Sequence, residues 1–327
     1  MNIPLTMAMT GYDHVHGITT GEVRVTGVDL TVLELPPPEI FARFVAQREW
    51  HISELSLAKY VALRASGDTS LTAIPVFPSR AFRHSAIFVR GDGPTRPEEL
   101  AGLRVGVPEW AQTAAVYTRS LLQHEWGVDL ADVSWVQAGL NQPGRVEKVA
   151  LRLPAGVTVT QLPDRSLNDL LLKGEIDAII SAHPPMGAVG GAAPITRMQA
   201  GSLEVERDYH RRTGIFPIMH VVAVRSDVTD EHPWLAANLL TAFEQAKKQS
   251  LARIEDIGVS RFPVPWLGYH LGAVMDAMGA DPWPYGVEAN RTTLEAFVGF
   301  CVEQGVAERA IALEELFAPQ VLGRVRL

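Results

Sequence analysis

Seven residues near the start of the chain, GYDHVHG (11–17), bring together four side chains that could transfer protons or bind a ligand. Tyr12 and Asp13 are followed by His14 and His16. Histidine has an ordinary pKa close to neutral pH, which suits it to acid–base catalysis. A His-x-His pair can also contribute to a metal site, and an Asp in such a loop can cap the following helix. The spacing alone leaves these three interpretations open.

Five further segments place polar side chains beside the expected end of a strand or start of a helix. These segments are SELS (53–56), FPSRAFRHS (77–85), GVPEWAQTA (106–114), SAHPPMG (181–187) and TGIFPIMH (213–220). Their candidate site residues are Glu54, Ser56, Ser79, Arg80, Arg83, His84, Glu109, Trp110, Gln112, Thr113, Ala114, His183 and His220. Ligands of α/β sheets bind beyond the carboxyl ends of the strands, so these positions are candidates for a site.

Two kinds of anion-binding group occur in these segments. An arginine can hold a planar carboxylate with two hydrogen bonds, and either Arg80 or Arg83 could do so. The sequence does not show which of the two points inward. Backbone N–H groups at Gln112, Thr113 and Ala114 stand at the start of a predicted helix, where they could seat an anion. The alternatives are surface salt bridges, helix capping and histidines packed in the core.

Apolar runs alternate with helical patterns along the chain, and these elements must position the candidate residues. Strands are predicted at 3–9, at two segments within 22–35, and at 51–57, 71–77, 84–92, 103–107, 133–139, 157–162, 176–182 and 216–228. Helices are predicted at 36–50, 57–65, after Pro108, and at 166–175, 232–254 and 291–305. This alternation predicts mainly parallel sheets with helices on their faces.

The composition is that of an acidic globular protein. The 327 residues suffice for two domains, and the chain is 47% hydrophobic with a net charge of −8. Nothing indicates the clustered basic face of a nucleic-acid-binding protein. The single cysteine, Cys301, cannot form an internal disulfide and lies in a helical pattern typical of a buried apolar residue. Because no signal-peptide pattern and no apolar span of ~20 residues occurs, we expect a cytoplasmic location without a membrane partner.

Seven blocks of the chain occur in an order that is distinctive of one protein family. These blocks are HISELSLAKY, IPVFPSRAFRHS, LRVGVPEWAQTAAVY, LLKGEIDAII, RRTGIFPIMHVV, WPYGVEANRTTLEAF and EELFAP. The blocks lie between residues 51 and 319, within a match that runs from near residue 10 to near residue 320, and VFPSRAFRH and TGIFPIMH are the most specific. Over almost its whole length, the chain resembles the 4,5-dihydroxyphthalate decarboxylase family.

The resemblance implies a two-lobed, type II periplasmic-binding-protein-like fold of the α/β class. Each lobe would hold a mainly parallel sheet flanked by helices. Lobe one would contain residues 1–90 and 219–327, and lobe two residues 91–218, with crossing strands at 84–92 and 219–227. Such lobes close on a small ligand in the cleft between them. A homo-oligomer is compatible with the sequence, which does not fix the oligomeric state.

The resemblance also implies decarboxylation of a small hydroxylated aromatic acid such as 4,5-dihydroxyphthalate. An acid must protonate the ring carbon that bears the carboxylate, and a base must take the proton of the para hydroxyl. A cationic or N–H clamp would hold the second carboxylate. The phenol accepts the electrons, so neither an organic cofactor nor a metal is expected. We predict catalysis by His14, His16, His84 and His220, and substrate contacts by Tyr12, Asp13, Glu54, Ser56, Ser79, Arg80, Arg83, Glu109, Trp110, Gln112, Thr113, Ala114 and His183.

The chain departs from the family's pattern at two places where substrate would be read. His14 stands where the family carries an arginine after its Tyr-Asp pair, and the segment 181–187 is atypical. Two alternatives stay open. One is a non-catalytic solute-binding protein for an aromatic or heterocyclic acid. The other is a metal-dependent decarboxylase or hydrolase that uses His14 and His16, although the order of elements differs from the eight β–α units of such barrels.

Overall fold

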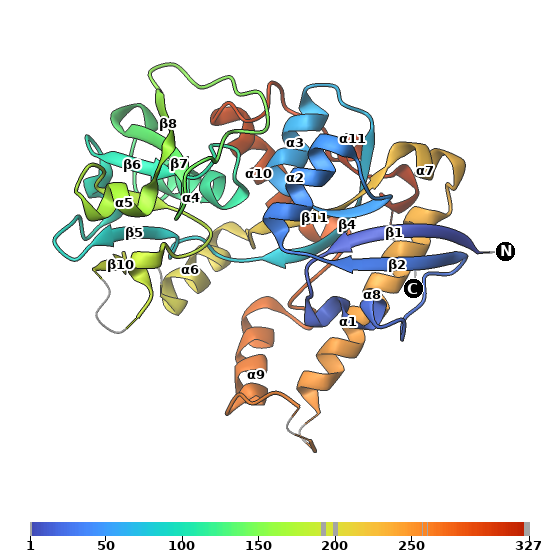
Figure 1. The fold of residues 1–327 in the computed structure, drawn as a ribbon. Helices are drawn as coiled ribbons and strands as arrows, with labels where there is room; N and C mark the ends of the chain where they lie inside the picture. Colours follow the sequence, from blue (N-terminus) through green and yellow to red (C-terminus); the bar gives the residue numbers. More distant parts are fainter. Residues whose placement is uncertain (1, 191–193, 199–201, 257, 260, 324–327) are drawn as a thin grey trace.

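The protein contains two β-sheets (Figure 1). The computed structural model describes residues 2–190, 194–198, 202–256, 258–259 and 261–323. The first sheet has the strand order β2-β1-β3-β11-β4. Its strands are β1 (Ile3–Met9), β2 (Val28–Glu34), β3 (Ile52–Ser56), β4 (Leu71–Arg80) and β11 (Ile218–Arg225). β1 is parallel to β2 and β3, whereas β11 is antiparallel to β3 and β4. A strand from late in the chain therefore lies inside the N-terminal sheet.

The second sheet has the order β10-β5-β9-β6-β7-β8. Its strands are β5 (Ile87–Arg90), β6 (Arg104–Val107), β7 (Ser134–Gly139), β8 (Val159–Ser166), β9 (Ala178–Ile180) and β10 (Ile195–Arg197). β6 to β9 are mutually parallel, and β5 and β10 add antiparallel strands at one edge. Two mainly parallel sheets with flanking helices confirm the predicted α/β class.

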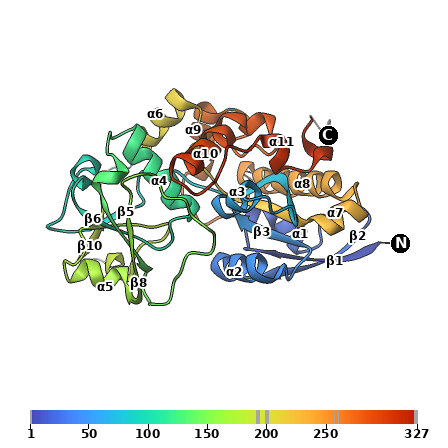
Figure 2. The same cartoon turned by 90° about the horizontal axis from the view of Figure 1, so that it is seen from above.

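Helices cover both sheets, as the two views show (Figures 1 and 2). They are α1 (His16–Thr19), α2 (Pro37–Gln47), α3 (Leu57–Ala65), α4 (Thr113–His124), α5 (Leu167–Leu172), α6 (Leu203–Thr213), α7 (Ser226–Glu231), α8 (Leu235–Glu255), α9 (Leu267–Met278), α10 (Arg291–Glu303) and α11 (Leu313–Leu316). In the part of the chain that the structure describes, no helix combines the length and apolar character needed to cross a bilayer.

One predicted strand is missing from the first sheet. Only Val28–Glu34 forms a strand within 22–35, whereas Val23 and Val25 are buried in a turn-rich segment. The N–H of Val23 donates to the carbonyl of Gly17 at 2.7 Å, so the segment pairs with the preceding loop and not with the sheet. Alternating valines are typical of a strand, but an irregular segment that buries the same side chains can have the same pattern.

Two connections carry the chain between the lobes. Residues 81–86 join β4 to β5, and α6 precedes the return into β11. The N–H of Ala81 donates to the carbonyl of Pro217 at 3.2 Å, which ties the two connections together. The strand Ile87–Arg90 lies in the second sheet, whereas the sequence-based boundary placed residues up to 90 in lobe one. A short apolar run has the same pattern in either sheet, so we now place this boundary at 81–86.

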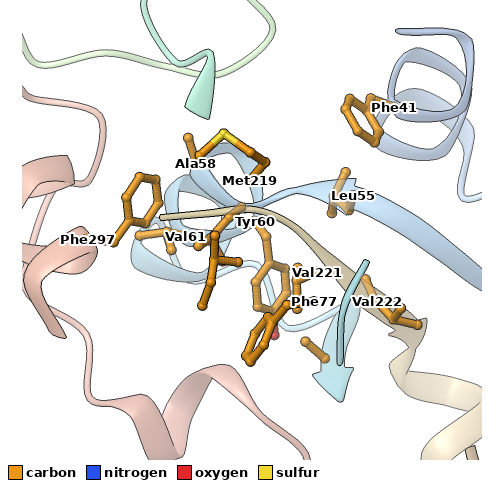
Figure 3. Close-up of a cluster of buried hydrophobic side chains, with 14 of the residues drawn as sticks. Phe41, Leu55, Ala58, Tyr60, Val61, Phe77, Met219, Val221, Val222 and Phe297 are labelled. Atoms are coloured by element: carbon orange, nitrogen blue, oxygen red, sulfur yellow. The ribbon is translucent and has the colours of Figure 1, made fainter. Parts of the chain in front are cut away.

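A continuous apolar core extends from the first sheet into lobe two. Tyr60 and Val61 of α3 pack beside Phe77 and Val221, and Phe297 of α10 reaches the same cluster (Figure 3). The ring of Phe297 also stacks on Tyr117 of α4, with the ring centroids 4.7 Å apart. Helix α10, which carries the buried Cys301, therefore joins both lobes behind the site described next.

Candidate active site

A cavity of about 400 Å³ lies between the lobes, where strands of both sheets end. Its lining residues are Thr10, Tyr12, Pro37, Pro38, Phe41, Ser56, Lys59, Ser79, Arg83, Gln112, Thr113, Ala114, Arg145, Ala182, His183, Met219 and His220. This volume lies within the roughly 300–1,000 Å³ range of small-molecule sites. A larger hollow of about 740 Å³ beside α9 contains no residue of the predicted site. The interlobe cavity is therefore the candidate active site.

A buried carboxylate organises the wall of the cavity that lobe one provides. Glu54 is inaccessible to solvent, and its Oε1 lies 2.6 Å from the hydroxyl of Tyr12 and 2.6 Å from Nδ1 of His220. The backbone N–H of Thr10 donates to the other oxygen at 2.9 Å. The ring of Phe41 meets His220 edge-on, with the centroids 4.9 Å apart. These contacts fix the imidazole between a carboxylate and an aromatic ring.

Strand register explains why these groups meet. Side chains two residues apart on a strand share a face, so Glu54 and Ser56 of β3 point the same way. In the antiparallel partner β11, His220 lies opposite Ser56 and Val222 lies opposite Glu54. His220 is thus a diagonal neighbour of Glu54, a separation that long side chains can bridge. The loop after β1 adds Tyr12 at the carboxyl end of the sheet.

The protonation states of this group follow from its hydrogen bonds. Burial alone would raise the pKa of Glu54, but the hydrogen bonds and charge of His220 and the hydroxyl of Tyr12 together lower it. Burial and the neighbouring Glu54 raise the pKa of Tyr12. The pair is therefore a carboxylate and a neutral phenol at neutral pH. The carboxylate favours a proton on Nδ1 of His220, which leaves Nε2 available to a ligand.

Arg83 provides a cation that has no carboxylate partner among the described residues. Its Nε lies 3.1 Å from the sulfur of Met219, and its Nη1 lies 3.4 Å from the carbonyl oxygen of Ala182. Burial lowers the pKa of Arg83 to about 10, with Glu206 opposing the shift, so the guanidinium stays charged at neutral pH. A thioether and a carbonyl satisfy such a group poorly. A ligand carboxylate would supply two matched acceptors.

A second cluster of basic side chains contains residues from both lobes. Lys59 of α3 in lobe one contacts the fully buried carboxylate of Glu109 in lobe two. The Nε of Arg145 lies 2.6 Å from the same carboxylate, and Lys148 lies 4.0 Å away. Burial would raise the pKa of Glu109, but these cations together lower it. Several positive charges thus share one negative charge, and this region of the cavity favours an anion.

The start of α4 lies beside this basic group. Gln112, its N-terminal cap, makes no side-chain capping bond, and Thr113 and Ala114 line the cavity. The hydroxyl of Thr113 lies 2.8 Å from that of Ser56 and accepts the N–H of Ala58 at 3.1 Å. Thr113 therefore connects the two lobes. The N–H of Gln112 donates to the carbonyl of Glu109 at 3.3 Å, so the N–H groups of Thr113 and Ala114 are what is left of the predicted anion seat.

Arg80, unlike Arg83, does not line the cavity. Successive side chains of a strand point to opposite faces, so Ser79 faces the cavity while Arg80 points to the other side of β4. There Arg80 contacts the side-chain oxygen of Asn290, and its Nη2 lies 3.1 Å from the carbonyl oxygen of Pro284. The carboxylate clamp that the sequence suggested at Arg80 is thus not supported, because this side chain donates its hydrogen bonds to buried oxygen atoms of the protein itself.

Replacing Arg80 by methionine should destabilise the protein by about 2 kcal/mol, because the buried acceptors that it satisfies lose their donor. Urea unfolding followed by circular dichroism measures the effect. Arg291→Met, at a half-exposed arginine of the surface, serves as the control and should change the free energy of unfolding by less than about 0.5 kcal/mol. An unfolding midpoint of R80M equal to that of the wild type would contradict a structural role for Arg80.

The loop 11–17 sends its polar side chains in different directions. Tyr12 lines the cavity, but Asp13 accepts a hydrogen bond at 2.9 Å from Arg253 of α8. His16 is exposed at the start of α1. Neither Asp13 nor His16 lines the cavity, so their predicted roles in the site are not supported. Their positions follow from the short helical turn after Tyr12, which rotates successive side chains away from one another.

His14 supports the site from outside. Its ring packs between those of Tyr12 and Trp283, with centroid distances of 5.3 and 5.4 Å, and it does not line the cavity. Burial lowers its pKa to about 4, although a hydrogen bond to the carbonyl of Pro78 opposes the shift. The ring is therefore neutral at pH 7. We infer that His14 holds Tyr12 in position and does not carry out the predicted proton transfer.

Two other predicted residues belong to the core. His84 packs between the rings of Tyr209 and Trp126 and is almost fully buried away from the cavity. Trp110 is fully buried under the guanidinium of Arg119, which lies 3.7 Å from the ring centroid. Neither residue lines the cavity, so the predicted catalytic role of His84 and substrate contact of Trp110 are not supported. The segment 81–86 is not helical, and its irregular course places His84 in this aromatic cluster.

The metal-dependent alternative has no geometric support. His14 and His16 lie on different sides of their loop, one packed against Trp283 and one exposed. Within the described ranges, no group of three or more His, Cys, Asp and Glu side chains is placed to hold a metal ion. A His-x-His spacing needs such partners to form a site.

The sequence of a known enzyme decides the family. No family model matches the chain. A 4,5-dihydroxyphthalate decarboxylase of Comamonas testosteroni is 36% identical over 322 residues, which cover 98% of this chain and 98% of that protein. The chain belongs to the 4,5-dihydroxyphthalate decarboxylase family. A second family member, from Pseudomonas putida, is 37% identical over 209 residues, or 63% of this chain and 81% of that protein. The resemblance found in the sequence is confirmed.

Solved structures of more distant proteins agree on the fold. The periplasmic aliphatic sulphonate binding protein SsuA from Escherichia coli has a TM-score of 0.56 at 13% identity and covers 98% of this chain and 99% of its own. The desulfurization enzyme DSZB has a TM-score of 0.51 at 19% identity and covers 98% of both chains. At these identities the likeness shows the fold alone. It confirms the predicted periplasmic-binding-protein-like architecture of this decarboxylase family member.

Sequence reasoning missed several residues that line the cavity. Lys59 stood in an otherwise apolar helix start, an unusual position that could have drawn attention. Arg145 lies in an irregular loop with no periodic signal. Phe41 and Met219 are apolar, and both belong to the buried cluster of Figure 3 as well as to the cavity lining. Thr10 contributes through its backbone N–H, which no sequence pattern reveals.

Proposed function

We propose that this family member removes one carboxylate from 4,5-dihydroxyphthalate and forms 3,4-dihydroxybenzoate and carbon dioxide. One observation carries the proposal. The same cavity presents a half-buried cation, Arg83, which has no carboxylate partner among the described residues, and a carboxylate-supported imidazole, His220. The first group suits an anionic substrate, and the second suits proton transfer with a phenol. The relatives' names supply the substrate class.

The distribution of charge orients the substrate. Its two neighbouring carboxylates belong at the basic side of the cavity, which Arg83, Arg145 and the start of α4 form. Its two hydroxyls then reach the Tyr12–Glu54–His220 group, because they lie at the opposite edge of the ring. Phe41 and the prolines of α2 offer an apolar surface to the ring between these ends. A dianion would balance the excess of positive charge in the cavity.

The chemistry follows from this orientation. Nε2 of His220 takes the proton of the hydroxyl para to the departing carboxylate, and Glu54 stabilises the resulting imidazolium. The ring carbon that bears the carboxylate gains a proton, and the ring becomes a dienone. The bond to the carboxylate then breaks, its electrons restore the aromatic ring, and His220 returns its proton to the oxygen. Carbon dioxide leaves, and the phenol itself has accepted the electrons throughout.

The direct test is incubation of the purified protein with 4,5-dihydroxyphthalate. We expect release of carbon dioxide and an equal amount of 3,4-dihydroxybenzoate, measured by gas analysis and liquid chromatography. Phthalate, which has no para hydroxyl, should bind without reacting. Binding of 4,5-dihydroxyphthalate with no carbon dioxide would contradict the proposal and would favour a solute-binding protein. A cytoplasmic location and a homo-oligomer stay predictions from the sequence.

A further inference from the structure

The proposed reaction consumes one proton that His220 cannot supply. His220 only borrows the hydroxyl proton and returns it, whereas the ring carbon keeps the proton that replaces the carboxylate. A second acid must therefore stand at the carboxylate end of the cavity. It must also exchange protons with solvent, because it loses one proton in every turnover.

His183 is the titratable group in that position. It follows β9 in lobe two and lines the cavity next to Ala182, whose carbonyl oxygen lies 3.4 Å from Nη1 of Arg83. Its side chain makes no hydrogen bond within the described part of the chain, where only its backbone N–H is bonded, to the hydroxyl of Ser181 at 3.4 Å. The residue lines the cavity and is exposed to solvent, so its ring can contact both.

The groups around His183 are mostly positive when the cavity is empty. Those that line or adjoin the cavity include Arg83 from the 81–86 connection, Arg145 and Lys148 from the loop after β7, Lys59 from α3, His220 from β11, and the carboxylates Glu109 and Glu54. Each carboxylate is already bound to a partner, Glu109 to Lys59 and Arg145, and Glu54 to His220. Burial, followed by the charges of Arg83, His220 and Arg145, lowers the pKa of His183. The free protein therefore keeps this ring neutral at pH 7.

A bound dicarboxylate would change the electrostatic environment of His183 from positive toward negative. Two negative charges beside Arg83 and Arg145 offset the positive field, and a carboxylate within about 4–6 Å of an imidazole favours its charged form by roughly 1–3 pKa units. Resting on the proposed function, we propose that His183 is the acid that protonates the ring carbon, and that the bound dianion places the proton on it. The substrate thus prepares its own proton donor.

The step balances in atoms and charge. The N–H bond of the imidazolium breaks as a π-electron pair of the ring forms the new C–H bond, and His183 becomes neutral. The substrate dianion and this one proton yield the 3,4-dihydroxybenzoate monoanion and carbon dioxide. Solvent then restores the proton at the solvent-exposed ring when the next dianion binds. No oxidant, reductant or metal takes part.

Proton uptake on phthalate binding tests the inference separately from activity. Titration calorimetry near pH 7, in buffers of different ionisation enthalpy, should show that wild-type protein takes up a fraction of a proton, up to one, per phthalate bound. The His183→Gln variant should lose most of this uptake, and its Kd for phthalate should rise by no more than about tenfold, because the charge gained by proton uptake also stabilises the bound dianion. In the same variant, kcat with 4,5-dihydroxyphthalate should fall about 10²-fold. His270→Gln, at an exposed histidine of α9, is the matched control and should behave like wild type.

The outcomes separate this inference from the proposed function. Uptake that persists in H183Q, uptake that disappears only in His220→Asn, an unchanged kcat in H183Q, or a wild type that does not bind phthalate would each overturn the role of His183. If wild type releases no carbon dioxide from 4,5-dihydroxyphthalate but takes up a His183-dependent proton with phthalate, the proposed reaction fails while the dianion-coupled protonation stands.

Discussion

The His220→Asn variant is expected to turn over 4,5-dihydroxyphthalate about 10³-fold more slowly than the wild type, because it lacks the nitrogen that exchanges a proton with the substrate hydroxyl. Asparagine is the informative replacement, since its amide can donate to Glu54 in place of Nδ1 and thus keep the buried carboxylate paired. The affinity for phthalate, which has no hydroxyl to contact, should change by less than about threefold. Steady-state kinetics and calorimetry measure the two quantities.

Two companion variants sharpen this prediction. Glu54→Gln removes the charge that stabilises the imidazolium and should lower kcat by about 10²-fold or more, with His220 still present. His14→Asn alters a histidine that contacts Tyr12 from outside the cavity, and we expect a loss below about tenfold. A loss at His14 as large as that at His220 would restore His14 as the principal acid–base residue and refute the assignment made from the cavity geometry.

The Arg83→Met variant is expected to bind phthalate about 10²-fold more weakly than the wild type, because truncating one partner of a buried charged pair typically costs roughly 2–5 kcal/mol. For 4,5-dihydroxyphthalate, the effect should fall mainly on KM. The unliganded variant should be at least as stable as wild type in urea, because the guanidinium is half-buried beside a thioether and no described carboxylate pairs with it to offset its desolvation. Binding and stability should therefore move in opposite directions.

Arg80→Met provides the matched control, since it removes the same charge three residues away. Its phthalate affinity should stay within about threefold of wild type, although its stability falls. If R80M loses affinity while R83M keeps it, the guanidinium that faces the substrate has been misassigned. An R83M protein that unfolds at lower urea would indicate that Arg83 is a structural cation and not a vacant anion receptor.

Local features of the site were predictable from the sequence, whereas the directions of individual side chains were not. The helix start at 112–114 and the strand-to-turn position of Ser56 were predictable, because capping patterns and strand ends are local features. The choice between Arg80 and Arg83 was not, because the predicted strand stopped at 77 and the real one continues to Arg80. Those three extra strand residues set the alternation that turns Ser79 toward the cavity and Arg80 away from it.

By itself the sequence determined the α/β class, the family and most of the segments that reach the cavity, because apolar periodicity and block order are properties of the chain alone. Only the tertiary structure decided which side chains cooperate. Glu54 and His220 are 166 positions apart and meet because β11 returns beside β3. The loop 11–17 attracted attention through two histidines, yet its contribution to the cavity is Tyr12. Spacing along a chain fixes local direction, whereas a site is assembled by strand register between segments that the sequence leaves unpaired.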